Sequence, residues 1–419
     1  MTALRRAAGG LLLLVAVLAG AGAAVVTLLL VAGATGVRVV AVLAALATAV
    51  AAAAALAVPA AKALGGARRV AVVSAPAVAV VVVGGLLAWL LVAPVPRALP
   101  AAGWPDVRHW ELPTGSRIAY AHTPPASAAR PEPVVLVHGG PGAPAAPRPE
   151  LARDLASAGF HVYDYHQLGA GLSSRLADVR GYTVERHVAD LEAIRTTLGA
   201  ERLMLVGASW GGKLIAAYLA AHPDRVAAAV VDSPSALWAP AFSQPLTPAG
   251  RADQDAAVAA HPRFAVAHAL ARSAGPRAAH TLLPDARMDG VFADFVGSLD
   301  RRPGCAPAPP EGGDPPRGFG FWVNAMTTID AETVADPRPA LRTATAPVLV
   351  LRAECDYIAW EVTREYRDVL PAATLVAVDG SGHTVTTDRP DLHRQLVRAH
   401  LLGEPLPRAA YDGAAPPWG

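Results

Sequence analysis

One short segment, residues 207–212 (GASWGG), constrains the fold of this chain more than any other. It follows an apolar run at 202–206 and precedes a helix-like stretch from Lys213 to Ala221. A serine at the centre of G-x-S-x-G is typical of a tight strand-to-helix turn, because a Cβ at either glycine would collide with neighbouring backbone. Such a turn exposes the Ser209 hydroxyl and aims the first helical amides at its target, so we expect the Trp210 amide to stabilise an oxyanion. The alternative is a glycine-rich turn that holds an ordinary serine.

Three further sites follow apolar, strand-like runs in the order that a serine nucleophile requires. Residues 138–142 (HGGPG) come after the run 133–137, and we expect the Gly140 amide to be the second oxyanion donor. Asp356 lies shortly after the run 347–351, and His383 shortly after 373–378. The chain order is therefore serine, then acid, then histidine, each near the carboxyl end of a strand.

With these residues in view, the chain resembles the α/β-hydrolase superfamily, and the pair HGGPG and G-x-S-W-G-G resembles its proline iminopeptidase branch. The likeness covers roughly residues 105–402, and it includes a third block at 165–173 (YHQLGAGLS). This block departs from the pattern of the branch at His166, where an aspartate is usual. The resemblance implies an α/β-hydrolase fold, in which a mostly parallel sheet carries helices on both faces and a helical cap is inserted.

The pattern of strands and helices predicts the same architecture and its boundaries. Runs typical of strands and helices alternate from Val134 to Val231, which favours a mostly parallel sheet, and residues 109–121 suggest two antiparallel edge strands. We expect the core to occupy 109–232 and 347–404, with a cap or lid at 233–346 and a C-terminal tail at 405–419. A separate domain or a disordered insert is the alternative for the cap.

The amino-terminal quarter of the chain is predicted to be a membrane region. No charged residue occurs for 31 residues after Arg6, for 23 after Arg38 and for 27 after Arg69. Each run exceeds the ~20 residues that cross a bilayer, so we expect about three transmembrane helices within 1–97, followed by a proline-rich linker at 98–108. Five basic residues precede the first helix or follow the second, against one between the first and second. This bias predicts a multi-pass cell-membrane protein with its hydrolase domain outside the cytoplasm.

Net charge and the spacing of cysteine and histidine limit the kinds of ligand that the sequence suggests. A net charge of +2 gives no indication of a nucleic-acid partner. The spacing of the 2 Cys and 13 His matches no metal motif, so we expect neither a metal nor a cofactor. Cys305 and Cys355 are open to two interpretations, a disulfide that fastens cap to core or two buried thiols. The sequence does not specify the oligomeric state.

The predicted chemistry is acyl transfer to Ser209, with His383 as general base and acid and Asp356 orienting the imidazole. Asp232, at the end of the preceding strand, is the competing acid. An aspartate nucleophile of the epoxide hydrolase kind is excluded because the elbow residue is a serine. Three functions remain open: an aminopeptidase, a carboxylesterase or lipase with the same triad, and a membrane-tethered binding module without activity.

The resemblance to proline iminopeptidases predicts a substrate with a free amino end. A protonated amine in a shielded pocket needs a carboxylate partner, and in this branch the cap supplies such acids. We expect Asp330 and Glu332 to form that pair and Trp322, in the adjacent aromatic segment, to line the pocket. Solvated charges on a helix surface are the alternative for the two acids.

Overall fold

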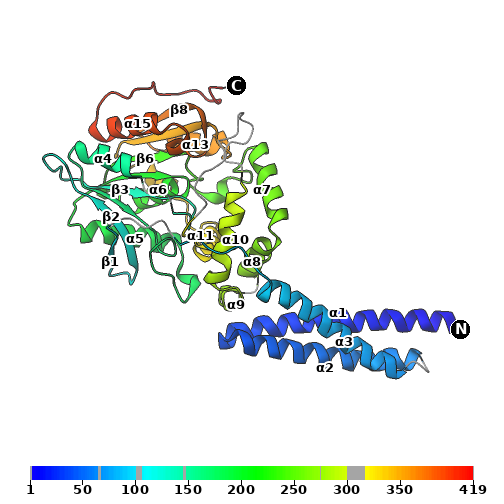
Figure 1. Ribbon diagram of the computed structural model, residues 1–419. Coiled ribbons are helices and arrows are strands. Elements are labelled where there is room, and N and C mark those ends of the chain that lie inside the picture. Colours follow the sequence, from blue (N-terminus) through cyan, green and yellow to red (C-terminus); the bar gives the residue numbers. More distant parts are fainter. Residues whose placement is uncertain are drawn as a thin grey trace. The chain divides into compact units, whose positions relative to one another are not determined.

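The computed structural model of the chain describes residues 2–64, 68–100, 106–144, 148–273, 275–299 and 317–418. The chain forms two compact units (Figure 1). Unit 1 comprises Met1–Val95 with Ala265–Pro284, and unit 2 comprises Pro96–Phe264 with Asp285–Gly419.

Three long apolar helices dominate unit 1, as predicted. They are α1 (Thr2–Thr35), α2 (Arg38–Leu64) and α3 (Arg68–Leu87), which continues into the short π-helix η2 (Ala88–Val92). Within the described residues, three segments are long and apolar enough to span a membrane: Ala7–Thr35, Arg38–Val58 and Val73–Val92.

These three helices pack through small residues and leave large ones exposed. Every fourth residue of α2 from Ala41 to Ala57 is a buried alanine, and a Cβ added at Gly20 of α1 would lie 3.0 Å from the Ala53 Cβ. Close backbone approach through small residues is typical of helices that pack inside a bilayer. The outward side chains, such as Leu18 and Leu30, are large and more than half exposed. An apolar exterior of this kind suits lipid rather than water.

Unit 2 is built on an eight-stranded sheet with strand order β1-β2-β4-β3-β5-β6-β7-β8. The first two strands pair antiparallel with each other, and the second pairs antiparallel with the fourth, whereas all other neighbours are parallel. This arrangement confirms the predicted fold, with its antiparallel edge. The strands are β1 (Arg108–Glu111), β2 (Arg117–Thr123), β3 (Val134–Val137), β4 (Val162–Tyr165), β5 (Leu203–Ala208), β6 (Val226–Asp232), β7 (Val348–Cys355) and β8 (Ala373–Gly382).

Helices cover both faces of the parallel part of the sheet. Helices α4 (Pro149–Ser157) and α15 (Pro390–Leu402) cover one face and bury Leu155, Leu396 and other apolar side chains against β3, β6 and β8. Helices α5 (Val184–Thr197), α6 (Trp210–Ala221), α12 (Arg338–Leu341) and α13 (Trp360–Val369) belong to the other layer, where α6 contacts β3, β5 and β6. Because both faces are covered, the central strands β3 and β5 are apolar along their whole length. The short helix α14 (Val385–Asp388) connects β8 to α15.

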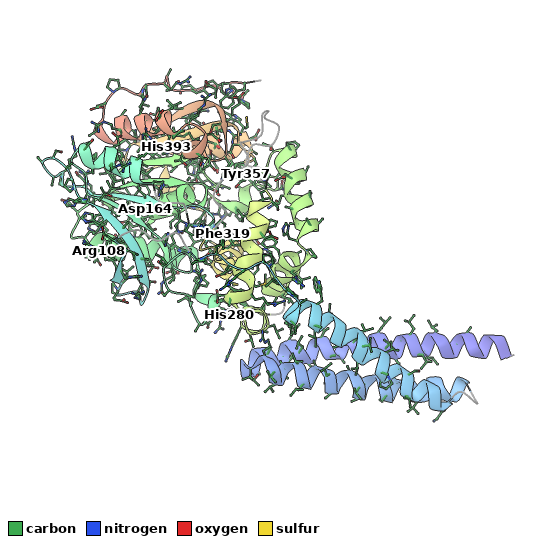
Figure 2. The ribbon with its side chains drawn as sticks, viewed as in Figure 1. Arg108, Asp164, His280, Phe319, Tyr357 and His393 are labelled. Atoms are coloured by element: carbon green, nitrogen blue, oxygen red, sulfur yellow. The ribbon has the colours of Figure 1, made fainter. Side chains whose placement is uncertain are left out.

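The insertion between β6 and β7 is helical, as the sequence predicts for a cap. It contains α7 (Pro248–Ala260), α8 (Pro262–Ser273), α9 (Pro276–Leu282), α10 (Asp285–Gly297) and α11 (Phe321–Asp330). In unit 2, Phe264 stacks on Phe295 with ring centroids 3.9 Å apart. Phe319, which is labelled in Figure 2, meets Phe292 edge-on at 5.5 Å. These aromatic contacts give the part of the insertion within unit 2 an apolar core of its own. The described residues also include three single 3-10 turns: η3 (Val179–Gly181), η4 (Pro223–Arg225) and η5 (Ala239–Ala241).

Candidate active site

Ser209 stands between the end of β5 and the start of α6 in a backbone conformation that a non-glycine residue rarely adopts. Its φ is 54° and its ψ is −119°. Such a conformation costs on the order of 1–3 kcal/mol and persists only where the surroundings enforce it. The Ser209 amide donates to the Asp232 carbonyl at 2.9 Å, and its own carbonyl accepts from the Ser235 amide at 3.1 Å. The turn from β6 into the insertion therefore holds the serine in place.

Two glycines make this turn possible, which is the local reason for the sequence motif. A Cβ at Gly207 would lie 2.8 Å from the Gly211 carbonyl carbon and from Ile215 Cδ1. A Cβ at Gly211 would collide with the carbonyl oxygens of Val137 and His138. Any side chain at either position would push the helix away from the sheet. The nucleophile-elbow geometry expected from the sequence is therefore present.

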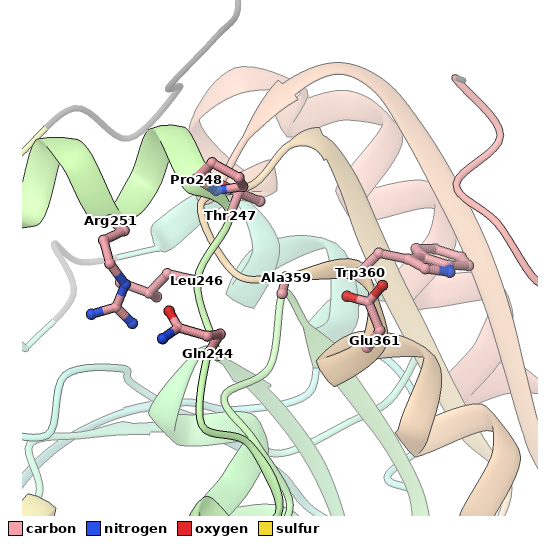
Figure 3. Close-up of a pocket in the computed structure, with 8 residues that line it drawn as sticks. All are labelled: Gln244, Leu246, Thr247, Pro248, Arg251, Ala359, Trp360 and Glu361. Atoms are coloured by element: carbon pink, nitrogen blue, oxygen red, sulfur yellow. The ribbon is translucent and has the colours of Figure 1, made fainter.

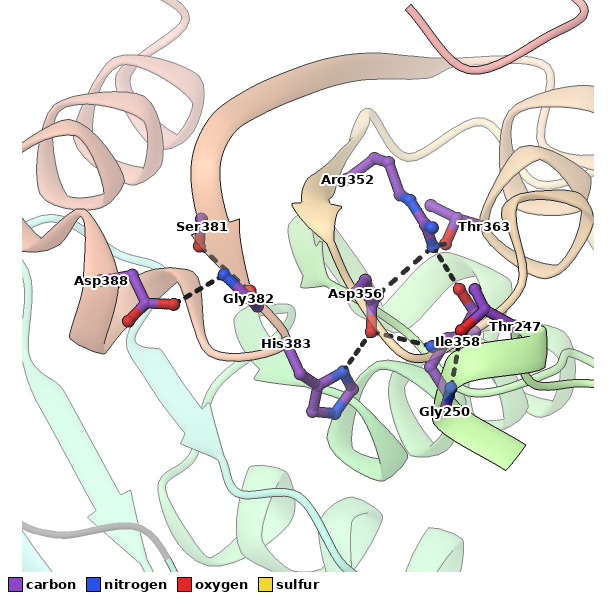
Figure 4. A network of polar contacts seen from close by, with 10 residues as sticks. All are labelled: Thr247, Gly250, Arg352, Asp356, Ile358, Thr363, Ser381, Gly382, His383 and Asp388. Carbon is purple, nitrogen blue, oxygen red and sulfur yellow. Dashed lines mark hydrogen bonds and ion pairs between the residues drawn. The ribbon is translucent and has the colours of Figure 1, made fainter. Parts of the chain in front are cut away.

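The carboxylate that contacts His383 belongs to Asp356. Asp356 immediately follows β7 and His383 immediately follows β8, and these neighbouring strands are parallel. The His383 Nδ1 and Asp356 Oδ1 atoms are 2.7 Å apart, and both residues are at most 9 % exposed (Figure 4). With Nδ1–H directed at a carboxylate, Nε2 is left as the basic nitrogen of the ring.

Two neighbours fix the Asp356 carboxylate. The Ile358 amide donates to Asp356 Oδ1 at 3.0 Å. Arg352, which is buried within β7, lies with Nη1 3.4 Å from Asp356 Oδ2 and donates to the Ile358 carbonyl at 2.8 Å. Burial lowers the pKa of Arg352, and the negative charge of Asp356 opposes that shift. Sequence reasoning did not single out Arg352, because a charged residue inside a buried strand becomes interpretable only when its partner is known.

Asp232, the competing acid, is buried without a hydrogen bond to either carboxylate oxygen. Its nearest basic group is His393 Nε2 of α15, 3.9 Å from Asp232 Oδ2 (Figure 2). Burial, together with repulsion from Asp356, raises the pKa of Asp232 well above its usual range. Burial also lowers the pKa of His393 to about 3. Burial thus disfavours the charged form of each group. The carboxylate paired with His383 is that of Asp356.

The loop that carries Gly140 lies against the elbow. A Cβ at Gly139 would lie 3.4 Å from the Ser209 Cβ, and Gly140 has a φ of 115°. The insertion holds the same loop from the other side, because Asn324 Nδ2 donates to the Pro141 carbonyl at 2.9 Å and the Gly320 amide donates to the Gly142 carbonyl at 2.8 Å. The amide of Trp210 is the first of α6, directly after Ser209. Trp210 thus directly follows the serine in the chain, and Gly140 follows Gly139, which lies against the serine. The oxyanion roles of Gly140 and Trp210 remain predictions.

The three residues expected to bind substrate occupy unequal positions. Trp322 is fully buried and meets Phe321 edge-on, so it has no surface open to a substrate in this conformation. Asp330 ends α11 and its Oδ2 accepts from the Val184 amide at 2.8 Å, at the start of α5. Glu332 is exposed. Their substrate-binding roles stay predictions.

Lys213, one helical turn after Ser209, is a further charged residue that the sequence did not single out. Its side chain is buried on α6. Burial lowers the pKa of Lys213 to about 8, and the negative charges of Asp330 and Glu332 partly oppose that shift. Lys213 therefore lies within electrostatic reach of both predicted amine-binding carboxylates.

His166, the position that departs from the iminopeptidase pattern, is buried and uncharged. Its Nδ1 accepts from the Leu172 amide at 3.0 Å, and burial lowers the pKa of His166 to about 3. A neutral imidazole therefore stands where the branch usually carries an acid.

The cysteine question is answered only for one residue. Cys355, next to Asp356, is disulfide-bonded. Cys305, the second cysteine of the chain, lies outside the described residues. Among the residues that the structure describes, no three His, Cys, Asp or Glu side chains group as a metal site would require.

A groove of about 660 Å³ opens beside the segment that follows Asp356, and none of Ser209, Asp356 and His383 lines it (Figure 3). Its walls are Gln244, Leu246, Thr247, Pro248, Arg251, Ala359, Trp360 and Glu361. A hydrogen bond joins two of the segments that form the groove, 245–247 and 357–359. The Thr247 amide donates to the Tyr357 carbonyl at 2.8 Å.

Comparison with known proteins decides the family. A family model described as alpha/beta hydrolase fold matches residues 132–390. The chain belongs to this family. The matched region contains the elbow, the Asp356–His383 pair and the whole insertion.

Curated relatives confirm the resemblance to proline iminopeptidases over a limited part of the chain. A proline iminopeptidase of Neisseria gonorrhoeae is 38% identical over 94 residues, which are 22% of this chain and 30% of that protein. Epoxide hydrolase A of Mycobacterium tuberculosis is 38% identical over 104 residues, 25% of this chain and 32% of the relative. The matches thus span about a third of these relatives. A crystal structure of a probable hydrolytic enzyme from Pseudomonas aeruginosa PAO1 shares the fold, with a TM-score of 0.50 and 21% identity over 74% of this chain and 99% of that chain.

Proposed function

We propose that this chain is a serine hydrolase that forms an acyl-enzyme on Ser209. The observation that carries the proposal is the 2.7 Å contact between His383 Nδ1 and Asp356 Oδ1, in a chain whose Ser209 occupies a strained elbow. A buried carboxylate on Nδ1 keeps the proton on that nitrogen, leaves Nε2 free to accept one, and stabilises the imidazolium that results. Strain of this kind is typical of functional sites.

The chemistry follows in two steps. Ser209 Oγ attacks the acyl carbonyl while its proton passes to His383 Nε2, and the amides of Gly140 and Trp210 stabilise the tetrahedral oxyanion. The bond to the leaving amine or alcohol breaks as His383 returns the proton to it. Water then attacks the acyl-enzyme by the same route and releases the acid, so the free enzyme is restored.

A fluorophosphonate probe tests this proposal. We expect the full-length protein to be labelled and the Ser209→Ala variant to remain unlabelled. Ser233 is a matched control, because it is also buried and also has a positive φ, 45°. Ser233→Ala should label like the parent. If the well-folded parent takes up no label, the silent binding module replaces the hydrolase.

Within this class we propose an aminopeptidase of the proline iminopeptidase kind, which acts on short peptides with a free amino end. The proline iminopeptidases among its relatives support it, and so do the HGGPG and G-x-S-W-G-G motifs. Asp330 and Glu332 are the proposed partners of the substrate amine. The Ser209 nucleophile separates the chain from an aspartate-dependent route to epoxide opening, although epoxide hydrolase A is among its relatives.

Lys213 favours the second candidate, a carboxylesterase. The negative charges of Asp330 and Glu332 oppose the lowering of the Lys213 pKa by burial, so both carboxylates already interact with a cation of the protein itself. A compensated carboxylate attracts a substrate amine less strongly. Kinetics on a free aminoacyl-arylamide, its N-acetylated form and an aryl ester of the same acyl group distinguish the two. Faster turnover of the free amine supports the aminopeptidase, whereas equal or faster turnover of the blocked amide or the ester supports the esterase.

We also propose that α1, α2 and α3 anchor the protein in the cell membrane with unit 2 outside the cytoplasm. The charge bias of the loops supports this orientation, and so does the disulfide at Cys355, because disulfides persist in oxidising compartments. External protease on intact cells should then release a fragment that begins near residues 94–105. Full protection, while a known surface protein is cut, would place unit 2 inside.

A further inference from the structure

Gln167, in the loop after β4, bonds to both segments that carry the proposed oxyanion donors. Its Nε2 donates to the His138 carbonyl at 2.7 Å, and its Oε1 accepts from the Trp210 indole Nε1 at 2.9 Å. Its backbone amide donates to His138 Nε2 at 2.9 Å. All three residues are at most 2 % exposed. One buried side chain thus links the HGGPG loop to the first residue of α6.

The His138 ring connects the backbone amide of Gln167 to the peptide group that precedes Gly140. Because Nε2 accepts from the Gln167 amide, the neutral ring carries its proton on Nδ1, which donates to the Gly139 carbonyl at 2.9 Å. Burial lowers the pKa of His138 to about 4, so the ring is neutral at physiological pH. In a planar trans peptide the C=O and the next N–H point in opposite directions. Holding the Gly139 carbonyl therefore fixes the direction of the Gly140 amide.

We propose that Gln167 is a positioning residue that holds the Gly140 and Trp210 amides in one fixed arrangement for the oxyanion. The proposal rests on the serine hydrolase function proposed above. Oxyanion donors act because they are preorganised, and misplacement by about 1 Å costs on the order of 10²-fold in rate. The Gln167 backbone amide acts on the Gly140 amide through the His138 ring, and the Gln167 side chain ties the His138 carbonyl to the Trp210 indole. A substitution of the side chain therefore keeps the first restraint and removes the link between the HGGPG loop and α6. Gln167 touches no reacting atom itself.

A purely structural role for Gln167 would predict lost stability with unchanged catalysis. Ser173 provides the matched control, since it is buried in the same loop and also makes two hydrogen bonds. Its Oγ accepts from the Ala119 amide at 2.9 Å and donates to the His166 carbonyl at 2.5 Å. Neither bond reaches the HGGPG loop or α6. Loss of buried hydrogen bonds at either site should lower the melting temperature by comparable amounts.

The first experiment compares Gln167→Leu with Ser173→Ala in the full-length protein. For each protein, kcat and KM are measured on a substrate that the parent cleaves. Thermal unfolding and the rate of fluorophosphonate labelling are measured separately. We expect similar losses of stability, but a kcat lower by about 10²-fold with a nearly unchanged KM only in Gln167→Leu. A Gln167→Leu kcat within about threefold of that of Ser173→Ala overturns the proposal. A parent protein without turnover or labelling defeats the proposed function instead.

The second experiment uses Gln167→Glu and pH. A protonated glutamic acid can donate to the His138 carbonyl and accept from Trp210 as glutamine does, whereas the ionised form is an acceptor only and faces that carbonyl. Burial should raise the pKa of the introduced carboxyl. We expect the ratio of variant to parent kcat to be highest at low pH and to fall as pH rises. A ratio below about one tenth at every pH overturns the proposal, because the neutral acid then fails to restore the donors.

Discussion

Replacing Asp356 with asparagine should abolish most turnover and leave the fold intact. The substitution keeps the shape of a buried side chain and removes one negative charge. The new amide has two orientations. One places its nitrogen at the Oδ1 position, 2.7 Å from His383 Nδ1, and reverses the tautomer of the ring. The other keeps that bond but turns the amide nitrogen toward Arg352 Nη1, 3.4 Å from Oδ2.

The size of the effect follows from the charge that is lost. Two unit charges at the 2.7 Å separation of these atoms interact by about 6 kcal/mol when the effective dielectric constant is about 20. At 1.36 kcal/mol for each tenfold change in rate, this energy corresponds to about four powers of ten. The same substitution in a serine protease triad has an effect of about 10⁴. We therefore expect kcat to fall by roughly 10³ to 10⁵.

Asp232→Asn is the control, since Asp232 is buried near His393, whereas Asp356 is paired with His383. Burial and Asp356 raise the pKa of Asp232, which favours its neutral form, so we expect an amide to change little electrostatically. Turnover of an activated aryl substrate, fluorophosphonate labelling and thermal unfolding are measured for both variants. The reasoning is refuted if Asp356→Asn stays within tenfold of the parent while Asp232→Asn is inactive.

Three more predictions concern stability. The hydrolase domain should lose stability as pH falls from about 6.5 toward 4, because four buried histidines (His138, His166, His187, His393) have pKa values of about 3 to 4, whereas the unfolded chain binds protons at these residues in this range. Each histidine lowers the free energy of unfolding by about 1.4 kcal/mol per pH unit. His187→Gln should reduce the pH dependence of the free energy of unfolding, measured with urea, by the equivalent of about one proton. Lys213 has a pKa of about 8 against 10.5 in the unfolded chain, so the parent should gain stability relative to Lys213→Met as pH rises from about 8 to 10.5, and a constant difference would contradict the burial argument. Gly211→Ala should cost roughly 1–3 kcal/mol or more and abolish labelling, whereas Gly84→Ala, with no atom within 4 Å of the added Cβ, should leave the melting temperature of unit 2 unchanged.

Local patterns in the sequence predict the fold and the elbow because their causes are local. A strand followed by G-x-S-x-G leaves few backbone solutions, and Ser209 adopts the expected strained turn. The structure extends β5 to Ala208 and starts α6 at Trp210, so the helix begins three residues before the stretch that the sequence marks as helical. Glycines at 211 and 212 obscure that start, since glycine disfavours a helix interior.

Pairings across the fold are what the sequence leaves open. Gln167 belongs to a recognisable block, but its bond to Trp210 depends on the way β4 and α6 are brought together. Arg352 lies in the buried strand β7, and only the structure supplies the Ile358 carbonyl to which it donates. The sequence predicts that Asp330 and Glu332 pair with a substrate amine. In the structure they act on the pKa of the buried Lys213, which lies in a helix more than a hundred residues earlier in the chain.

The bond from the Ser235 amide to the Ser209 carbonyl bears on how caps are exchanged between related proteins. The insertion begins at Ser233, yet its first residues help to hold the backbone of Ser209 in place. The Ser233 amide donates to the Leu351 carbonyl at 3.0 Å, and the Tyr366 hydroxyl donates to the Ser235 carbonyl at 2.6 Å. A graft that joins a foreign cap at residue 233 would remove the restraint on Ser209, whereas one that joins after Ser235 would preserve it. The junction for exchanging the cap should therefore be placed inside the insertion, after Ser235.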